Sequence, residues 1–242
     1  MQLARRGGVG VAALVAGAAV LLAVEIQLAR SGSRLPHVEL VLDRSGAGRR
    51  VVWLGDSTAA GVGASGSSGA LPSQVEDGLG APDASLAVLA VSGARAADVR
   101  ADQLPKVAGL RPDLGLISVG ANDTIHLTGR GAFRRTYEEL VRALPAGVPV
   151  VLLGVPDMGA IPRFAQPLRA VVGWRGRNLD AEVRRVAAAT GAVYADIAGR
   201  TGPAFRHDPG RYFAADDFHP SDAGYGLWAE AVLTVLRKFG LP

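Results

Sequence analysis

From Arg50 onward, short apolar runs alternate with longer amphipathic stretches, and this alternation limits the chain to few folds. The apolar runs, each the length of one buried strand, span 51–54, 86–91, 114–119, 148–153 and 192–195. Helical patterns fill the intervals at 72–80, 96–110, 131–144 and 170–190, and a last one covers 222–239. Strands that alternate with helices predict an α/β domain whose parallel sheet is covered on both faces.

Composition excludes several other classes of protein. Of 242 residues, 49% are hydrophobic, so the chain can bury a core and is not disordered over most of its length. Cysteine is absent, which excludes disulfides, thiolate metal sites, a cysteine nucleophile and a lipidated cysteine. The net charge is +4, but arginines alternate with acids, and no basic stripe interleaved with aromatic residues is present. We therefore expect no nucleic-acid partner.

The N-terminal part predicts a membrane segment. Arg5 and Arg6 precede an uncharged stretch over 7–24, which as a helix would measure about 27 Å and just span a bilayer. We expect a membrane anchor over 1–29, a spacer over 30–49 and one folded domain over 50–242, with the domain outside the cytoplasm. A cleaved signal peptide, which would give a secreted domain, is the alternative, although the following residues offer a poor cleavage site.

Three predicted strands end in residues suited to a site, at the edge where open parallel sheets bind ligands. Ser57 follows the first strand directly, and Gly55 before it permits a tight turn that presents the hydroxyl. Gly93 follows the second strand and Asn122 the third. Backbone N–H groups and an asparagine amide are typical donors of an oxyanion hole. Each segment alone is equally typical of an ordinary turn.

A candidate base lies near the C-terminus. His219 has Asp216 three residues ahead of it, and an acid at this spacing can reach Nδ1 and leave Nε2 free to accept a proton. His126 stands in the same relation to Asp123, so spacing alone leaves it open as a second base.

Two further acids flank His219. In a helix-like turn the residue three positions earlier folds back toward the ring, which favours Asp216 over Asp217. We expect Asp217 to be solvated and Asp222 to serve as a cap or dipole partner of the last helix.

Taken together, these segments resemble the four blocks of the SGNH or GDSL hydrolase family, in the family's order: Gly55-Asp56-Ser57, Ser92-Gly93, Gly120-Ala121-Asn122-Asp123 and Asp216-Asp217-Phe218-His219-Pro220. The resemblance covers roughly residues 50–236. It implies a three-layer, flavodoxin-like α/β/α fold with a five-stranded parallel sheet. The first block departs from the family's fuller pattern after Ser57, which leaves the nucleophile intact.

The resemblance also implies a set of roles. Ser57 is the nucleophile, Asp216 and His219 complete the triad, and the oxyanion hole consists of Ser57, Gly93 and Asn122. The family's order favours His219 over His126 as the base. The implied activity is hydrolysis of an acyl or acetyl ester, as an esterase, lipase or deacetylase, without metal or cofactor.

Other readings are weaker. The run 61–66 fits GxGxxG, but six residues separate it from the strand, and no ribose-binding acid follows the second strand, which disfavours a dinucleotide enzyme. No GxSxG elbow of an α/β-hydrolase is present. The main rival is a membrane-tethered carbohydrate- or lipid-binding module on an inactive hydrolase scaffold. Such a module is expected to have lost Ser57, Asn122 or His219, and all three are present.

The sequence leaves the substrate open among an acetylated envelope sugar, a short acyl ester and a lysophospholipid. The segment 156–177 combines Met158, Ile161, Phe164 and Trp174 with four arginines. It either forms a lipophilic wall over the site or packs the following helix, and the pattern does not separate these alternatives.

Overall fold

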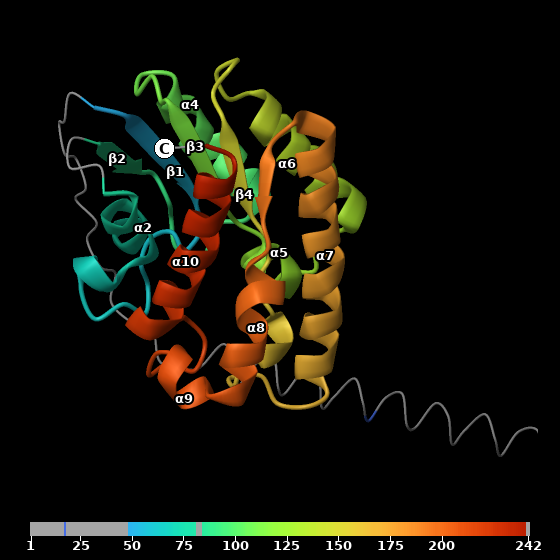
Figure 1. Ribbon diagram of the computed structural model, residues 1–242. Helices are drawn as coiled ribbons and strands as arrows, with labels where there is room; N and C mark the ends of the chain where they lie inside the picture. The colour runs from blue at the N-terminus through green and yellow to red at the C-terminus, as the bar shows by residue number, and fades with distance from the viewer. Residues whose placement is uncertain (1–16, 18–47, 81–83, 241–242) are drawn as a thin grey trace, which may run out of the picture.

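The computed structural model describes residues 17, 48–80 and 84–240, and within them it contains the predicted sheet with every strand parallel (Figure 1). The strands are β1 (Arg50–Gly55), β2 (Ser85–Val88), β3 (Leu114–Ser118), β4 (Val150–Leu153) and β5 (Val193–Ala195). Their order is β2-β1-β3-β4-β5. This is the flavodoxin-like order, in which the chain reverses direction across the sheet between β1 and β3. The predicted fold is confirmed, and a ligand is expected beyond the carboxyl ends of these two strands.

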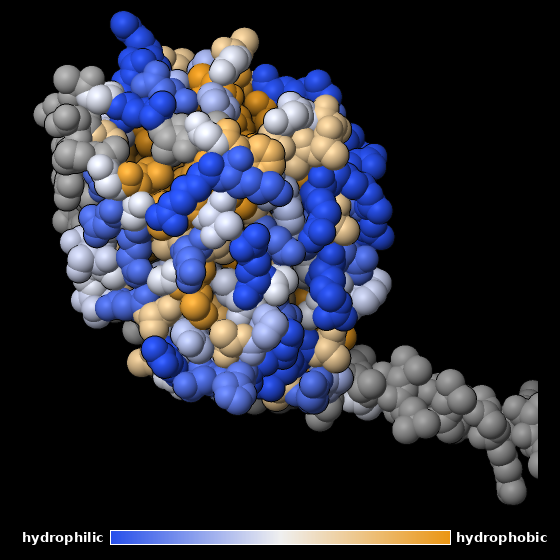
Figure 2. Space-filling view, viewed as in Figure 1, coloured by the Kyte–Doolittle hydropathy of each residue, from blue (hydrophilic) through white to orange (hydrophobic). Residues whose placement is uncertain are grey.

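Helices cover both faces of the sheet. On one face α2 (Leu71–Leu79) packs against α10 (Asp222–Lys238), and on the other α6 (Arg130–Arg142) packs against α7 (Leu168–Thr190) (Figure 1). Hydrophilic side chains cover much of the outer surface of α7 and α10 in the face that Figure 2 shows. Strands β3 and β4 are buried along their whole length, as expected of parallel strands between two helical layers.

The helix predicted over 96–110 is interrupted. The chain forms α3 (Ala96–Asp98), a π-helical turn η2 (Val99–Gln103) and α4 (Leu104–Val107) in succession. Pro105 has no N–H to donate to the carbonyl four residues earlier, so a regular α-helix cannot pass through this point with all its bonds intact. The π turn ends on Gln103, which is buried against the end of β1.

Several short elements were not predicted. They are α5 (Ala121–Ile125), α8 (Ile197–His207), α9 (Pro209–Tyr212) and the 3-10 turns η1 (Ser67–Gly69) and η3 (Met158–Ala160). Helix α8 contains Gly199, Gly202 and Pro203, which lower its helical propensity and conceal it in the sequence. Asp196 stabilises its first turn, because the carboxylate accepts a hydrogen bond of 2.9 Å from the N–H of Gly199.

The predicted membrane anchor over 7–24 lies outside the described residues, apart from Gly17. In the part of the chain that is described, no helix combines the length and the apolar character needed to cross a membrane.

Candidate active site

Ser57 lies in the tight turn that follows β1, at the point where the sheet order reverses. The Oδ1 atom of Asp56 accepts hydrogen bonds from the backbone N–H of Thr58 at 3.0 Å and from its hydroxyl at 2.8 Å. The N–H of Asp56 donates to the carbonyl of Ser118 at the end of β3, at 3.1 Å. The turn is thus fixed both within itself and to the neighbouring strand.

Gln103 holds the residue at which β1 ends. Its Oε1 accepts from the N–H of Gly55 at 2.9 Å, and its Nε2 donates to the carbonyl of Gly55 at 2.8 Å. Gly55 must be glycine, because a Cβ there would lie 2.3 Å from the carbonyl oxygen of Ser118. The sequence pattern did not indicate this role of Gln103. The available signal was a polar residue on the inward side of the predicted helix.

The structure brings Ser57, His219 and Asp216 into one hydrogen-bonded chain. Nδ1 of His219 lies 2.6 Å from Oδ2 of Asp216, and Nε2 lies 3.0 Å from Oγ of Ser57. With the carboxylate at Nδ1, the proton resides on that nitrogen, and Nε2 is left to accept from the serine hydroxyl. This is the geometry of a Ser-His-Asp triad.

Backbone hydrogen bonds hold the carboxylate of Asp216 in place independently of its contact with the ring. Its Oδ1 accepts the N–H groups of Phe218 and His219, each at 3.0 Å. The surrounding loop closes on itself, because the N–H of Ala214 donates to the carbonyl of His219 at 2.8 Å and Phe213 forms an antiparallel bridge with Pro220. The acid and the base are therefore parts of one compact loop.

The other histidine and acids lie elsewhere. Nδ1 of His126 lies 2.9 Å from the carbonyl oxygen of Asn122, whereas the carboxylate of Asp123 accepts the N–H of Ala96 at 2.9 Å. His126 is thus not the ring that pairs with Ser57.

Neither of the two acids after Asp216 is paired with the ring of His219. Asp217 is exposed, with a left-handed backbone at φ 55°. Asp222 stands in the first turn of α10, where its carboxylate accepts hydrogen bonds from the N–H and the hydroxyl of Ser65, while the capping residue of that helix is Ser221.

Gly93 and Asn122 flank the same site. Gly93 adopts φ 85°, a conformation that favours glycine. Nδ2 of Asn122 donates to the carbonyl of Ala94 at 3.1 Å, which ties the β3 end to the Gly93 turn and leaves the second amide hydrogen free. In the described ranges, no backbone hydrogen bond occupies the N–H of Ser57 or of Gly93. Within this part of the chain, these two N–H groups and one amide hydrogen of Asn122 are thus left without a hydrogen bond to the backbone.

Comparison with known proteins assigns this arrangement to a family. The model of the GDSL-like lipase/acylhydrolase family matches residues 53–227, which include every candidate residue named above. The chain belongs to this family. A GDSL-like esterase of Mycobacterium tuberculosis is 36% identical over 132 residues, which make up 54% of this chain and 42% of that protein. The chain therefore spans about two fifths of the length of this curated relative.

Solved structures of GDSL-like and related hydrolases share the fold. A lipase/acylhydrolase from Enterococcus faecalis superposes with a TM-score of 0.65 at 22% identity, covering 79% of this chain and 97% of that one. A phospholipase A1 from Streptomyces albidoflavus gives 0.60 at 21% identity, over 78% and 100% of the two chains. An acetylxylan esterase from Geobacillus stearothermophilus gives 0.59 at 22% identity, over 81% and 96%. The family resemblance inferred from the four motifs is confirmed.

The pKa values of two buried carboxylates near Ser57 are shifted in opposite directions. Burial alone would raise the pKa of Asp216, but hydrogen bonds from the ring and backbone of His219 outweigh it, and the pKa is lowered. For Asp56 burial prevails over the two hydrogen bonds from Thr58, and it raises the pKa to about 6. Asp216 therefore stays ionised in the presence of its partner, whereas Asp56 is costly to ionise.

The GxGxxG run has a packing role in this GDSL-like domain. Gly63 has φ 101°, and a Cβ there would lie 2.4 Å from the carbonyl of Pro220 and 2.8 Å from Cβ of His219. The glycine thus lets the His219 loop approach the loop after β1. The hydroxyl of Tyr225 on α10 donates to the carbonyl of Val62 at 2.5 Å and strengthens the same contact. These contacts explain Gly63 without a nucleotide.

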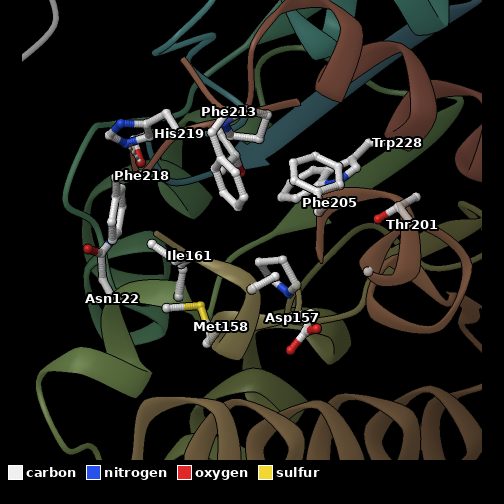
Figure 3. Close-up of a pocket in the computed structure, with 17 residues that line it drawn as sticks. Asn122, Asp157, Met158, Ile161, Thr201, Phe205, Phe213, Phe218, His219 and Trp228 are labelled. Carbon is white, nitrogen blue, oxygen red and sulfur yellow. Dashed lines mark hydrogen bonds between the residues drawn. The ribbon is translucent and has the colours of Figure 1, made fainter. Parts of the chain in front are cut away.

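A pocket opens beside Ser57 and His219 (Figure 3). Met158 and Ile161 line it, so the segment after β4 contributes a wall as one of the two alternatives expected. Phe164 is buried behind Phe218, edge-on at 5.8 Å between ring centroids. Trp174, by contrast, is 59% exposed on α7 and takes no part. Of the four apolar residues, Met158 and Ile161 thus line the pocket, and Trp174 does not.

Within the described ranges, no three histidine, aspartate or glutamate side chains gather closely enough to hold a metal ion.

Proposed function

We propose that this chain is a serine esterase that hydrolyses carboxylic esters through an acyl-enzyme intermediate. The observation that supports it most strongly is the continuous hydrogen-bonded chain from Asp216 through His219 to Ser57. In the first step Nε2 of His219 accepts the hydroxyl proton while Oγ of Ser57 bonds to the ester carbonyl carbon. The same nitrogen then returns the proton to the leaving alkoxide, so an alcohol departs and the acyl group stays on Ser57.

Water completes the cycle. His219 removes a proton from a water molecule that attacks the acyl-serine, and the collapse of the second tetrahedral intermediate releases the acid and restores the serine hydroxyl. The negative oxygen of each intermediate is stabilised by the N–H groups of Ser57 and Gly93 and by the amide of Asn122. The amide of Asn122 is held by its bond to Ala94 before substrate binds, so this donor needs little reorganisation in the reaction.

The test is the pair Ser57→Ala and Ser68→Ala. Ser57→Ala should abolish hydrolysis of p-nitrophenyl butanoate and leave urea unfolding nearly unchanged, because losing one hydroxyl opens little cavity. Ser68 is an exposed serine of η1, and its replacement should leave turnover at the level of the unaltered chain. Full turnover in Ser57→Ala would refute the assignment. An unaltered chain that hydrolyses no ester would instead favour a binding module.

We further propose that the 7–24 stretch anchors the enzyme in a membrane with the esterase domain outside the cytoplasm. The support is the length of the apolar run and the position of Arg5 and Arg6 before it. Protease added to intact spheroplasts should digest the domain, whereas a cytoplasmic marker stays intact. Protection of the domain would refute the orientation, and recovery of a shortened soluble form would show cleavage.

A further inference from the structure

The pocket beside Ser57 has a shape that bears on which ester is hydrolysed, an inference that rests on the proposed esterase function. Its empty volume, open mouth included, is about 520 Å³, within the usual range of small-molecule sites. Its walls come from the segment after β4, from α8, from the His219 loop and from α10. The turn after β1 and helix α5 complete the lining with Ser57 and Asn122, so segments from distant parts of the chain enclose one hollow.

The pocket has two distinct ends. In Figure 3, His219 and Asn122 lie at one end, whereas Trp228, Phe205 and Thr201 lie at the other. Met158 and Ile161 stand between them along one side. A group that enters past Ser57 therefore extends away from the reacting atoms and meets the side chains of α8 and α10.

The chemistry of the lining is that of an alkyl-binding site. Phe205, Phe213 and Trp228 are each at most 8% exposed, and they pack on one another around the far part of the pocket. The carboxylate of Asp157 also lines this part, where its Oδ1 accepts the N–H of Gly159 at 3.2 Å and its Oδ2 forms an ion pair with Arg206. A sugar ring would find few partners for its hydroxyls among these mainly apolar side chains, whereas an alkyl chain needs none.

The size of the enclosed space limits the length of that chain. The enclosed part of the pocket has room for only a few groups the size of a water molecule. A methylene group is similar in size to a water molecule. A few carbons beyond those at the mouth therefore fill the pocket.

The direction of the ester follows from the order of the reaction. The alcohol leaves first, and water must then reach His219 while the acyl group is still bound to Ser57. An alcohol held in the closed end would block that exchange, whereas an acyl chain held there leaves the mouth free. We propose that this pocket binds the acyl chain of the substrate, selects linear acyl groups of about four to six carbons, and has its depth set by Trp228 and Thr201.

A pair of isomeric esters tests the direction. Ethyl hexanoate and hexyl acetate have the same atoms, but the six-carbon chain is on the acyl side in the first and on the alcohol side in the second. The full-length chain should hydrolyse ethyl hexanoate with a kcat/KM at least tenfold higher. Equal values, or a preference for hexyl acetate, would overturn the proposal.

A series of p-nitrophenyl esters tests the depth. From acetate to butanoate and hexanoate, kcat/KM should rise up to about fourfold for each methylene buried, and it should fall at least tenfold at decanoate. Trp228→Leu should move the optimum to longer chains, and Thr201→Leu should move it to shorter ones. Trp174→Leu, the same change at an exposed site, is the control and should leave the profile unchanged. A profile that falls steadily from acetate would overturn the proposal while leaving the esterase intact.

A binding measurement distinguishes failure of the pocket proposal from failure of the esterase proposal. In Ser57→Ala, which cannot form the acyl-enzyme, calorimetry should find hexanoate bound at least tenfold more tightly than acetate. This preference together with no turnover in the unaltered chain would support the alkyl pocket and reject the esterase. Equal binding of the two acids would overturn the pocket even where esters are hydrolysed.

Discussion

Replacing Asp216 by asparagine should inactivate the enzyme through the tautomer of His219, without displacing the ring. In the unaltered chain, Oδ1 of Asp216 accepts two backbone N–H groups and Oδ2 faces Nδ1 of the ring at 2.6 Å. An asparagine side chain that keeps its oxygen toward the two N–H groups turns its NH₂ toward Nδ1. That nitrogen must then accept, so the ring proton moves to Nε2, and Nε2 can no longer take the proton of Ser57.

The size of the effect follows from this rearrangement. In the Ser-His-Asp triads of serine proteases, the same replacement lowers turnover about ten-thousandfold, which corresponds to about 5 kcal/mol of transition-state stabilisation. Here the two backbone bonds specify the asparagine orientation as firmly, so we expect a fall in kcat of about 10³ to 10⁴ with little change in KM. Stability should fall by about 1 kcal/mol or more, because the variant loses a charge-assisted bond.

Asp217→Asn is the matched control. Asp217 is the next residue along the chain, is exposed, and has a left-handed backbone that asparagine also tolerates. Its kcat should stay within about twofold of the unaltered chain, as for other exposed substitutions. The assay is the hydrolysis of p-nitrophenyl butanoate from pH 5 to 9, with urea unfolding of both variants. A larger loss in Asp217→Asn than in Asp216→Asn would refute the reasoning.

Three further outcomes are expected. Asn122→Ala should lower kcat about 10²- to 10³-fold with a smaller change in KM, because its amide binds the oxyanion more strongly than the ester; an effect on KM alone would contradict this. Gly63→Ala should lower both stability in urea and kcat, because its Cβ would collide with Pro220 and His219, whereas Gly66→Ala, with nothing within 4 Å and an extended backbone, should lower neither as much. Asp56→Asn should stabilise the fold at pH 8 by up to about 3 kcal/mol, since the pKa of Asp56 is raised by burial to about 6 and the folded carboxylate is disfavoured above that pH. The gain should shrink as pH falls from 6 to 4 and vanish below the unfolded pKa; a gain that grows toward acid would refute it.

The sequence predicted the sheet and the grouping of the site because both depend on local patterns. Each buried strand is a short apolar run, and parallel strands bring their carboxyl ends to one edge, so Ser57, Gly93 and Asn122 had to approach one another. Asp216 was predicted because three residues of a turn return its carboxylate to His219, and the structure has that contact.

Features that depend on packing between distant segments were not predictable. Gln103 reaches Gly55 only because a π turn rotates the helix, and the packing role of Gly63 depends on a loop more than 150 residues away. Helix α8 was hidden by its glycines and proline, although it forms part of the pocket wall. The segment over 156–177 could not be divided between pocket and helix because its apolar residues suit both.

The closed loop that holds Asp216 and His219 makes catalysis sensitive to local unfolding. The acid and the base are three residues apart, whereas the hydroxyl they serve lies 162 residues from the base in the chain. If α10 detached, breaking the Tyr225 bond to Val62 and the Asp222 bonds to Ser65, the loop could leave with its internal bonds intact, and of the two triad bonds only the one to Ser57 would be lost. Activity in rising denaturant therefore measures the docking of this C-terminal segment onto the first strand, and it should decline no later than the sheet itself unfolds.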